Sequence, residues 1–422
     1  MLQLQTIREN QDEVIRRLAK KNFKGDTIQQ VAALDTERRK ALTELETLKA
    51  EANSIAKQVG AFMKAGNKAE ADELKNKSVA LKETEKKLQD VLTKLEQDQF
   101  DLLVQVPNLP DEQVPEGRTP EDNKEVFRHG EIPKLYAGAK PHWELAAQYD
   151  LIDFELGVKL TGAGFPVYKG KGARLQRALI NFFLDRATAA GYLEVQPPIM
   201  VNKDSGFGTG QLPDKEGQMY HVTADDLYLI PTAEVPITNI YRDVILKAED
   251  LPVKNCGYTP CFRREAGSYG KDVRGLNRLH QFDKIEIVQV AHPSKSYEAL
   301  EEMRNYVAGL LTELGLPFRT LLLCGGDMSF ASAMTYDMEV YSTAQEKWLE
   351  VSSVSNFEAF QSNRLKLRFR EGSEKPQLAH TLNGSALALP RIVASLLENN
   401  QTAEGILIPP VLRPYTGFDI IN

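Results

Sequence analysis

Residues Cys261 to Val290 read CFRREAGSYGKDVRGLNRLHQFDKIEIVQV. The pattern predicts two β-strands joined by a long loop that is rich in glycine and charge. From His280 onward, alternation places Phe282, Lys284 and Glu286 on one face of the second strand. That face therefore mixes an aromatic ring with both signs of charge instead of being purely apolar.

The end of the first strand adds further charge. Arg263 and Glu265 are two residues apart, so they share one side of an extended chain. A sheet does not gather such groups for stability, because burying charges without partners costs several kcal/mol. Guanidinium groups bind phosphate, a ring offers a base a stacking surface, and carboxylates bind amines or metal ions. The segment predicts a polyanion site; the alternative interpretation is an ordinary β-hairpin with a solvated basic loop.

The segment resembles motif 2 of the class II aminoacyl-tRNA synthetases, in the form carried by seryl-tRNA synthetases. The match covers Phe262-Arg263-Arg264-Glu265 and then Arg-Leu-His-Gln-Phe-Asp-Lys-Ile-Glu at 278–286. A helical stretch from Arg174 to Ala190, followed by an extended segment ending at Pro198, resembles motif 1, which builds the dimer interface in that class. The other matching segments are Thr232-Ala233-Glu234, Glu350-Val351-Ser352-Ser353 and Asn383 to Arg391, the last of which resembles motif 3 and is expected to open a helix.

For the nucleotide, the resemblance implies an ATP site on an antiparallel sheet. Arg263 would bridge the α-phosphate of ATP and the carboxyl group of the amino acid, and Arg391 would be the second catalytic residue. Glu265 and Phe282 would seat the adenine. The expected ATP-binding set is Arg263, Arg264, Glu265, Arg278, Phe282, Glu350, Val351, Ser352, Ser353 and Arg391. Within it, Glu350 and Ser353 are expected to hold Mg²⁺, which prefers hard oxygen ligands.

For the amino acid, the resemblance implies L-serine, which would be activated as seryl-adenylate and transferred to the 3′ end of tRNA(Ser), with tRNA(Sec) left open as a second substrate. The expected serine-binding set is Thr232, Ala233, Glu234, Arg263, Glu286, Asn383 and Ser385. A pocket built to hydrogen-bond a hydroxyl group rejects alanine, because its polar groups would be left unpaired. Thr232 also fits a helix N-cap with Glu234 in the first turn, and the two roles are compatible.

The N-terminal region carries a heptad pattern in two runs. The first contains Val31, Leu34, Arg38, Ala41, Leu45, Leu48, Ala52, Ile55 and Val59, and the second contains Leu74, Leu81, Leu88, Leu95 and Leu102. The chain must reverse between them, near Gly60 and Gly66. This predicts two antiparallel helices of about 29 residues and an arm about 45 Å long.

The arm by itself suits dimerisation and RNA binding equally well. The resemblance favours RNA, because seryl-tRNA synthetases use such an arm on the long variable arm of their tRNA. Several lysines near the expected tip suit phosphate contacts: Lys57, Lys64, Lys68, Lys75 and Lys77.

These observations predict an α+β protein, with an N-terminal antiparallel coiled-coil arm and a class II catalytic domain in which helices flank an antiparallel sheet. Residues 1–106 are the expected tRNA-binding domain, with the arm at about 27–99. Residues 107–125 are the expected linker, because four prolines interrupt helix and strand there. Residues 126–422 are the expected catalytic domain.

Composition sets wider bounds. The 422 residues are 42% hydrophobic and 26% charged, as in ordinary soluble proteins. No apolar run reaches the roughly 20 residues that span a bilayer, and the N-terminal residues lack the apolar core of a secretory signal. We expect a cytoplasmic homodimer without membrane contact. The three cysteines, Cys256, Cys261 and Cys324, are expected to be buried thiols rather than disulfides or zinc ligands.

Two other functions fit parts of the sequence. One is a synthetase-like paralogue that passes its activated amino acid to a carrier protein, but such paralogues lack the long arm. The other is a coiled-coil scaffold with an inactive catalytic domain. Such a domain should have lost its charged motif residues, yet Arg263, Glu286, Glu350 and Arg391 are all present.

Overall fold

The computed structural model describes residues 1–214, 217–265 and 274–422. These residues form two compact units. One contains residues 2–19 and 23–107, and the other contains residue 1, residues 20–22 and residues 108–422. The loop of the motif 2 segment, 266–273, lies outside the described residues.

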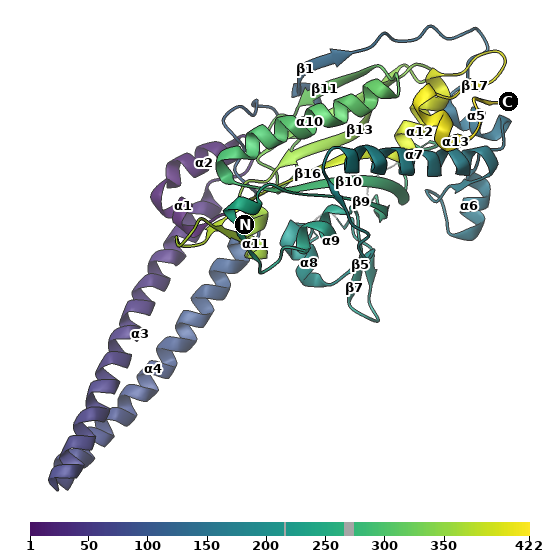
Figure 1. Cartoon of the computed structure of the whole chain (residues 1–422). Coiled ribbons are helices and arrows are strands. Elements are labelled where there is room, and N and C mark those ends of the chain that lie inside the picture. The colour runs from purple at the N-terminus through teal and green to yellow at the C-terminus, as the bar shows by residue number, and fades with distance from the viewer. Residues whose placement is uncertain (215–216, 266–273) are drawn as a thin grey trace. The chain divides into compact units, whose positions relative to one another are not determined.

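The first unit is helical. Two short helices, α1 (Leu4–Glu9) and α2 (Gln11–Ala19), precede the long helices α3 (Asp26–Ala65) and α4 (Lys68–Leu103), which run side by side in Figure 1. Ion pairs between Lys77 and Glu51 at 2.9 Å and between Arg38 and Glu96 at 3.8 Å show that α3 and α4 are antiparallel.

The long helices exceed the expected length of about 29 residues, because α3 spans 40 residues and α4 spans 36. Gly60 does not end α3 but lies inside it, exposed and with open space around it. An exposed glycine inside a helix costs only about 1 kcal/mol relative to alanine, which pairing along the seam outweighs. Gly66 ends α3 instead: it adopts a φ of 80° and donates its N–H to the carbonyl groups of Phe62 and Met63.

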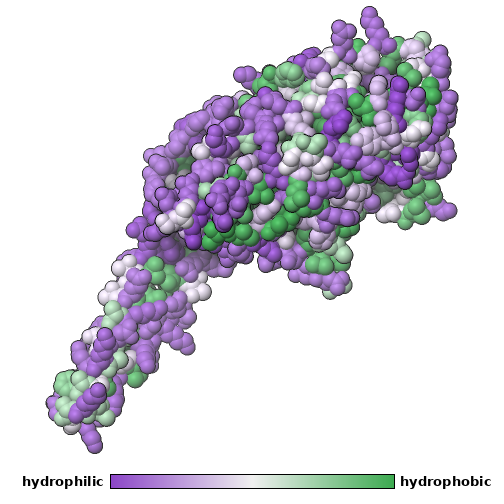
Figure 2. Space-filling view, in the orientation of Figure 1, coloured by the Kyte–Doolittle hydropathy of each residue, from purple (hydrophilic) through white to green (hydrophobic). Residues whose placement is uncertain are grey.

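The predicted heptad seam is confirmed. Val31, Ala41, Leu45 and Ile55 are buried on α3, and Leu92 is buried on α4. Leu92 lies outside the predicted second run, and all five leucines of that run are half-buried, as a two-helix seam allows. Hydrophilic residues cover much of the visible surface of these helices in Figure 2.

The second unit is organised around one sheet, which has eight strands among the described residues. Their order is β1-β11-β12-β13-β16-β10-β9-β4, and all neighbours are antiparallel except β4 and β9. The predicted antiparallel sheet is therefore confirmed, with one parallel edge strand. The bounds are β1 (Lys124–His129), β4 (Leu193–Glu194), β9 (Val253–Phe262), β10 (Gln281–Ala291), β11 (Phe318–Leu322), β12 (Met334–Ser342), β13 (Lys347–Asn356) and β16 (His380–Ala388).

Helices cover the two faces of this sheet differently. On one face, α7 (Gly170–Ala189), α10 (Ser296–Glu313) and α12 (Leu389–Asn399) pack against the strands and form the main core (Figure 1). Met338 and Val340 of β12 and Ile285 of β10 belong to that core. On the other face, α9 (Glu234–Asn239) contacts β9 and β10, and α11 (Phe360–Leu365) contacts β16. The candidate site lies on this second face.

The segment from Asn383 differs from the expectation that it opens a helix. Residues 383–388 are the end of β16, and α12 begins only at Leu389. The strand state is favoured because these residues pair with β10 on one side and, through Asn383 and Gly384, with β13 on the other. Asn383 and Ser385 therefore project from a central strand, and only Arg391 belongs to the helix.

The remaining elements are short. They form the small sheets β15-β14-β8, β5-β7-β6, β2-β3 and β17-β18, together with several helices. Their bounds are β2 (Ile152–Asp153), β3 (Val167–Tyr168), β5 (Met200–Val201), β6 (His221–Val222), β7 (Leu227–Leu229), β8 (Ile245–Lys247), β14 (Arg368–Arg370), β15 (Gln377–Leu378), β17 (Ile406–Leu407), β18 (Ile420–Ile421), α5 (His142–Gln148), α6 (Phe154–Leu160), α8 (Lys203–Thr209) and α13 (Arg413–Thr416). Among the described residues, no helix is both long and apolar enough to cross a membrane.

Candidate functional site

Strand pairing gathers the predicted residues on one sheet face. In β10, Lys284 and Glu286 alternate with the core residues Ile285 and Ile287 and so face the side opposite the main core, whereas the half-buried Phe282 ring also packs against that core. Glu286 lies opposite Ser385 of β16, and Asn383 follows two residues earlier on the same face of that strand. One central hairpin and one neighbouring strand thus supply most of the polar groups.

A buried hydrogen-bonded group forms where the start of α9 meets β10. Thr232 donates to Glu286 Oε2 at 3.2 Å and accepts from Lys284 Nζ at 2.9 Å. The Lys284 ammonium group also pairs with Glu286 Oε2 at 2.5 Å. Thr232 accepts the backbone N–H of Glu234 as well, although Ala233 is the N-cap residue of α9. The expected N-cap at Thr232 is thus one residue too early, although the Thr232 hydroxyl group accepts a backbone N–H from the first turn.

Glu234 completes this group from α9. Its side chain is buried, and Gln361 of α11 donates to its Oε1 at 2.7 Å. Burial, followed by the nearby charge of Glu286, raises the pKa of Glu234 to about 7. Asn383 lies close enough to favour the charged form of Glu234, yet its buried Nδ2 makes no hydrogen bond of normal geometry with the described residues. This corner therefore has acceptors and a donor available for a small polar ligand.

Lys284 and Gln361 were not among the predicted site residues. Lys284 could have been found, because alternation along β10 already placed it between Phe282 and Glu286. Its side chain is only 7% exposed, so it needs the partners that Thr232 and Glu286 provide. Gln361 has no comparable local signal, since it reaches Glu234 from 127 residues away in the chain.

Arg263 and Phe282 lie together as predicted. The Arg263 guanidinium group lies 5.2 Å from the centre of the Phe282 ring, and its Nε donates to the Pro231 carbonyl at 3.4 Å. The backbone N–H of Arg263 donates to the His280 carbonyl at 2.9 Å, which extends the β9–β10 hairpin by one pair. A planar cation and an aromatic ring are thus placed beside each other on the site face.

Glu265 and Arg278 contact each other directly. Arg278 Nη1 lies 2.8 Å from Glu265 Oε2, and Glu265 adopts a φ of 49°. The resemblance had implied that Glu265 seats the adenine and that Arg278 also binds ATP. In this structure the two side chains form an ion pair with each other, whereas the neighbouring Arg264 is exposed.

The motif 3 arginine contacts β13. Arg391 Nη1 donates to the Glu350 carbonyl at 2.6 Å and lies 3.5 Å from Glu350 Oε2. Ser352 is buried and donates to the Ser385 carbonyl at 2.6 Å, so its hydroxyl group holds β16. The Val351 side chain packs in the main core, so it can face a nucleotide only through its backbone.

The oxygen groups expected to hold a metal ion lie beside a further carboxylate. Asp337 faces Ser353 across the β12–β13 ladder, and burial followed by the charge of Glu350 raises the pKa of Asp337 well above its usual range. Its Oδ1 is buried without a hydrogen-bond partner among the described residues. A divalent cation beside Asp337 would favour its ionised form. Glu350 and Ser353 lie next to it and offer the oxygen ligands that Mg²⁺ prefers. Within the described ranges, no cluster of three or more His, Cys, Asp or Glu residues forms a preformed metal site.

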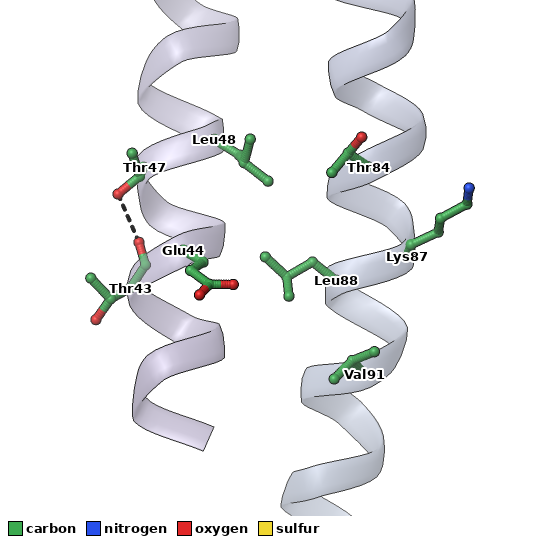
Figure 3. Close-up of a pocket in the computed structure, with 8 residues that line it drawn as sticks. All are labelled: Thr43, Glu44, Thr47, Leu48, Thr84, Lys87, Leu88 and Val91. Atoms are coloured by element: carbon green, nitrogen blue, oxygen red, sulfur yellow. Dashed lines mark hydrogen bonds between the residues drawn. The ribbon is translucent and has the colours of Figure 1, made fainter. Parts of the chain in front are cut away.

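A separate hollow lies between α3 and α4. Its volume is about 540 Å³, and Figure 3 shows Leu48 and Leu88 from opposite helices pointing into it. Two helices cannot enclose both sides of their seam, so such hollows follow from the architecture. It contains no group that suits the chemistry of the sheet face.

The sheet face can bind two kinds of chemical group side by side. The buried carboxylates, with Thr232 and Asn383, suit a small ligand that carries an ammonium group and a hydroxyl group. Arg263, Arg391 and the Phe282 ring suit phosphates and a flat base. Cys261 lies opposite Phe282, and burial raises the pKa of its thiol, so it is not a reactive nucleophile.

Comparisons with known proteins agree with this arrangement. Residues 1–110 match the family model of the seryl-tRNA synthetase N-terminal domain. Residues 220–400 match the tRNA synthetase class II core domain (G, H, P, S and T).

Similar proteins extend over nearly the full chain. The serine–tRNA ligase of Salinibacter ruber is 51% identical over 421 residues, which cover 99% of this chain and 98% of the relative. A crystal structure of seryl-tRNA synthetase from Pyrococcus horikoshii complexed with ATP is 34% identical, with a TM-score of 0.94 and coverage of 100% of this chain and 99% of the other. The cytoplasmic serine–tRNA ligase of Naegleria fowleri in complex with AMP is 26% identical, with a TM-score of 0.90 and the same coverage.

Proposed function

Because the chain belongs to the seryl-tRNA synthetase family, and is thus an enzyme that attaches serine to tRNA, we propose that it first converts L-serine and ATP to seryl-adenylate. The serine would then pass to the 3′ end of tRNA(Ser). The observation that carries this proposal is the buried group of Thr232, Glu234, Lys284 and Glu286, placed on the same sheet face as Arg263 and Phe282.

The buried group supplies the serine site. Glu286 and Glu234 attract the ammonium group, and Thr232, Asn383 and Ser385 complete a polar wall. Lys284 reduces the repulsion between the two carboxylates, because its ammonium group pairs with Glu286 and favours the charged form of Glu234. Alanine would leave these buried groups without partners, which costs more than the loss of one hydrogen bond.

The nucleotide lies on the neighbouring part of the face. Activation requires the serine carboxylate to attack the α-phosphorus of ATP, after which pyrophosphate leaves. Arg263 contacts both the Phe282 ring and the carbonyl group of Pro231, which precedes Thr232, so it can neutralise both anions as they approach. No side chain has to act as nucleophile or strong base, and rate enhancement comes from orientation and electrostatic stabilisation.

Two further sets of residues act on the phosphates. Arg278 and Arg391 are assigned to the γ-phosphate, so the ion pair between Arg278 and Glu265 must open when ATP binds. This opening also frees Glu265 for the adenine. Glu350 and Ser353 would hold Mg²⁺, which neutralises phosphate charge when it is bound.

The helices α3 and α4 are assigned to tRNA, and the catalytic unit is assigned to a homodimer through its motif 1 segment. Lys57, Lys64 and Lys68 are exposed near the turn between the helices and suit phosphate contacts. Lys75 and Lys77 are less available, because they pair with Asp72 and Glu51.

The test is amino-acid-dependent exchange of pyrophosphate with ATP, measured with each of the twenty standard amino acids for the wild type and for Glu286→Gln. We expect serine to give the highest rate, and the substitution to raise the KM for serine strongly while leaving the KM for ATP almost unchanged. A preference for another amino acid would overturn the proposed function, and unchanged serine kinetics in Glu286→Gln would overturn only the site assignment.

Charging of tRNA completes the test. Transfer of serine to tRNA(Ser) transcripts is expected, and tRNA(Sec) transcripts assayed in parallel decide the second substrate. Exchange with serine but no charging of any tRNA would instead support transfer to a carrier protein.

A further inference from the structure

A buried polar network connects α5, α12 and the returning end of the motif 2 segment. His142, the first residue of α5, is fully buried, as is Glu398 near the end of α12. Glu398 Oε1 accepts from the backbone N–H of His142 at 2.9 Å and lies 2.7 Å from His142 Nδ1. Ser342 donates to the other oxygen, and Gln345 Nε2 donates to Oε1 at 2.9 Å.

The hydrogen bonds determine which imidazole nitrogen carries the proton. A carboxylate only accepts, so His142 Nδ1 carries the proton and donates a hydrogen bond to Glu398. The opposite nitrogen, Nε2, accepts the backbone N–H of Leu276 at 2.8 Å. Glu398 therefore orients the ring so that an acceptor faces the chain just after the loop of motif 2.

Residues 274–277 come close to His142 and its neighbours. Gly275 adopts a φ of 66°, and a Cβ atom there would clash with His142 Nε2. Neighbouring residues are also held by the same region: the Arg274 guanidinium group lies 4.7 Å from the Trp143 ring centre, and Asn277 Nδ2 donates to Gln345 Oε1 at 2.9 Å.

Both arginines assigned to the γ-phosphate depend on this segment. Arg278 follows Asn277 directly, and the Asn277 carbonyl accepts from Arg391 Nε at 3.1 Å. Arg391 and Glu398 belong to the same helix, α12. Glu398 thus contacts His142, His142 contacts Leu276, and the next residue, Asn277, contacts Arg391, which lies on the same helix as Glu398.

We propose that His142, oriented by Glu398, is a positioning residue that sets Arg278 and Arg391 for the phosphates of ATP. The role depends on one atom, Nε2, as the acceptor for Leu276. The inference rests on the proposed function, because that function assigns the two arginines to ATP.

Two substitutions separate the two sides of the imidazole ring. In His142→Asn, the amide nitrogen takes the place of Nδ1 and keeps the contact with Glu398, but nothing reaches Leu276. In His142→Gln, the longer side chain puts its carbonyl oxygen near the place of Nε2, which restores an acceptor for the Leu276 N–H. If the network only stabilised the fold, His142→Gln would have no reason to bind ATP better than His142→Asn.

The measurement is serine-dependent pyrophosphate exchange with ATP and serine varied in turn. Losing one buried hydrogen bond is worth about 1.4 kcal/mol, so we expect the KM for ATP to rise about tenfold in His142→Asn. The KM for serine should stay close to that of the wild type, and His142→Gln should recover most of the affinity for ATP. Equal effects of both substitutions, equal changes for serine and ATP, or no change in His142→Asn would each overturn the inference.

Gly275→Ala provides an independent test if the His142 variants do not fold. It displaces the chain from Nε2 but leaves His142 and Glu398 intact, so it should raise the KM for ATP selectively as well. Normal ATP kinetics in Gly275→Ala would then overturn the inference. Absence of serine-dependent exchange in the wild type would overturn the proposed function itself, which keeps the two failures distinct.

Discussion

Arg263 contributes charge to the site rather than packing to the core. Its side chain is half-exposed and contacts the Pro231 carbonyl and the Phe282 ring. We expect Arg263→Ala to lower pyrophosphate exchange on the order of 10²-fold or more, because a charge-assisted contact is lost in the transition state. The fold should persist, as checked by circular dichroism and thermal unfolding.

Arg128 provides a matched control for this substitution. Its guanidinium group also lies 5.2 Å from an aromatic ring centre, that of Trp348, but on the edge strand β1. Arg128→Ala should leave exchange near the wild-type rate. Exchange in Arg263→Ala within a few-fold of the wild type would contradict the assigned role of Arg263.

Glu234 makes serine binding depend on pH. Burial and the charge of Glu286 raise its pKa to about 7, so its carboxyl group is mainly protonated below that pH and ionised above it. Only the ionised form attracts the serine ammonium group. We therefore expect the KM for serine to fall as the pH rises from about 6 to about 8.

The isosteric variant Glu234→Gln isolates this effect. It cannot ionise, so its KM for serine should be higher than that of the wild type at pH 8 and should vary less across the same range. The same pH profile in both proteins would show that another group controls serine binding. Lys284 and Glu286 face Glu234 and remain unchanged in this comparison.

At the scale of elements, α3 and α4 belong to a different compact unit from the sheet, so we expect that they can be shortened without unfolding the sheet. Arg38 on α3 and Glu96 on α4 face each other, with Arg38 Nη1 3.8 Å from Glu96 Oε1. The deletion therefore replaces residues 39–95 by a short glycine bridge between the two helices. We expect serine-dependent exchange to stay within a few-fold of the wild type and charging of tRNA(Ser) to be lost. Loss of both activities would indicate a structural role for the arm, and normal apparent affinity for tRNA would exclude RNA binding by it.

A triple substitution of Lys57, Lys64 and Lys68 by alanine is the milder control for that deletion. It keeps both helices but removes three exposed charges. Each lost phosphate contact should reduce the slope of log affinity against log salt by about 0.7 to 0.9.

At the scale of the whole molecule, we expect the edge strand β4 to take part in the contact between two copies of the chain. β4 ends the eight-stranded order of the described sheet, and its Leu193 is 66% exposed. An exposed apolar residue on an edge strand favours pairing with another chain. We expect the wild type to sediment as a dimer and Leu193→Lys to dissociate at a higher protein concentration than the wild type.

Leu160 allows the control for this experiment, because it is 67% exposed on the short helix α6. Leu160→Lys should leave the dimer unchanged. Equal dissociation of the two variants would mean that β4 is not specifically involved, and a monomeric wild type would exclude the homodimer.

The sequence by itself determined the features that repeat locally. Seven-residue spacing placed Val31 and Leu45 in the seam of α3, and two-residue alternation placed Lys284 and Glu286 on one face of β10. These positions follow from the geometry of a helix or strand and need no knowledge of the partner. The resemblance to motif 2 then linked that face to ATP and serine.

Tertiary structure decided what each residue contacts. Gln361 reaches Glu234 from α11, and Glu398 orients His142 across 256 residues of chain. Local spacing carries no signal for such contacts, because they depend on how distant elements pack. Packing of α3 against α4 also keeps Gly60 in the helix, although the low helix propensity of glycine had suggested that the helix ends near there. Sequence periodicity thus assigned residues to faces, and the packing of the sheet with its helices turned those faces into a site.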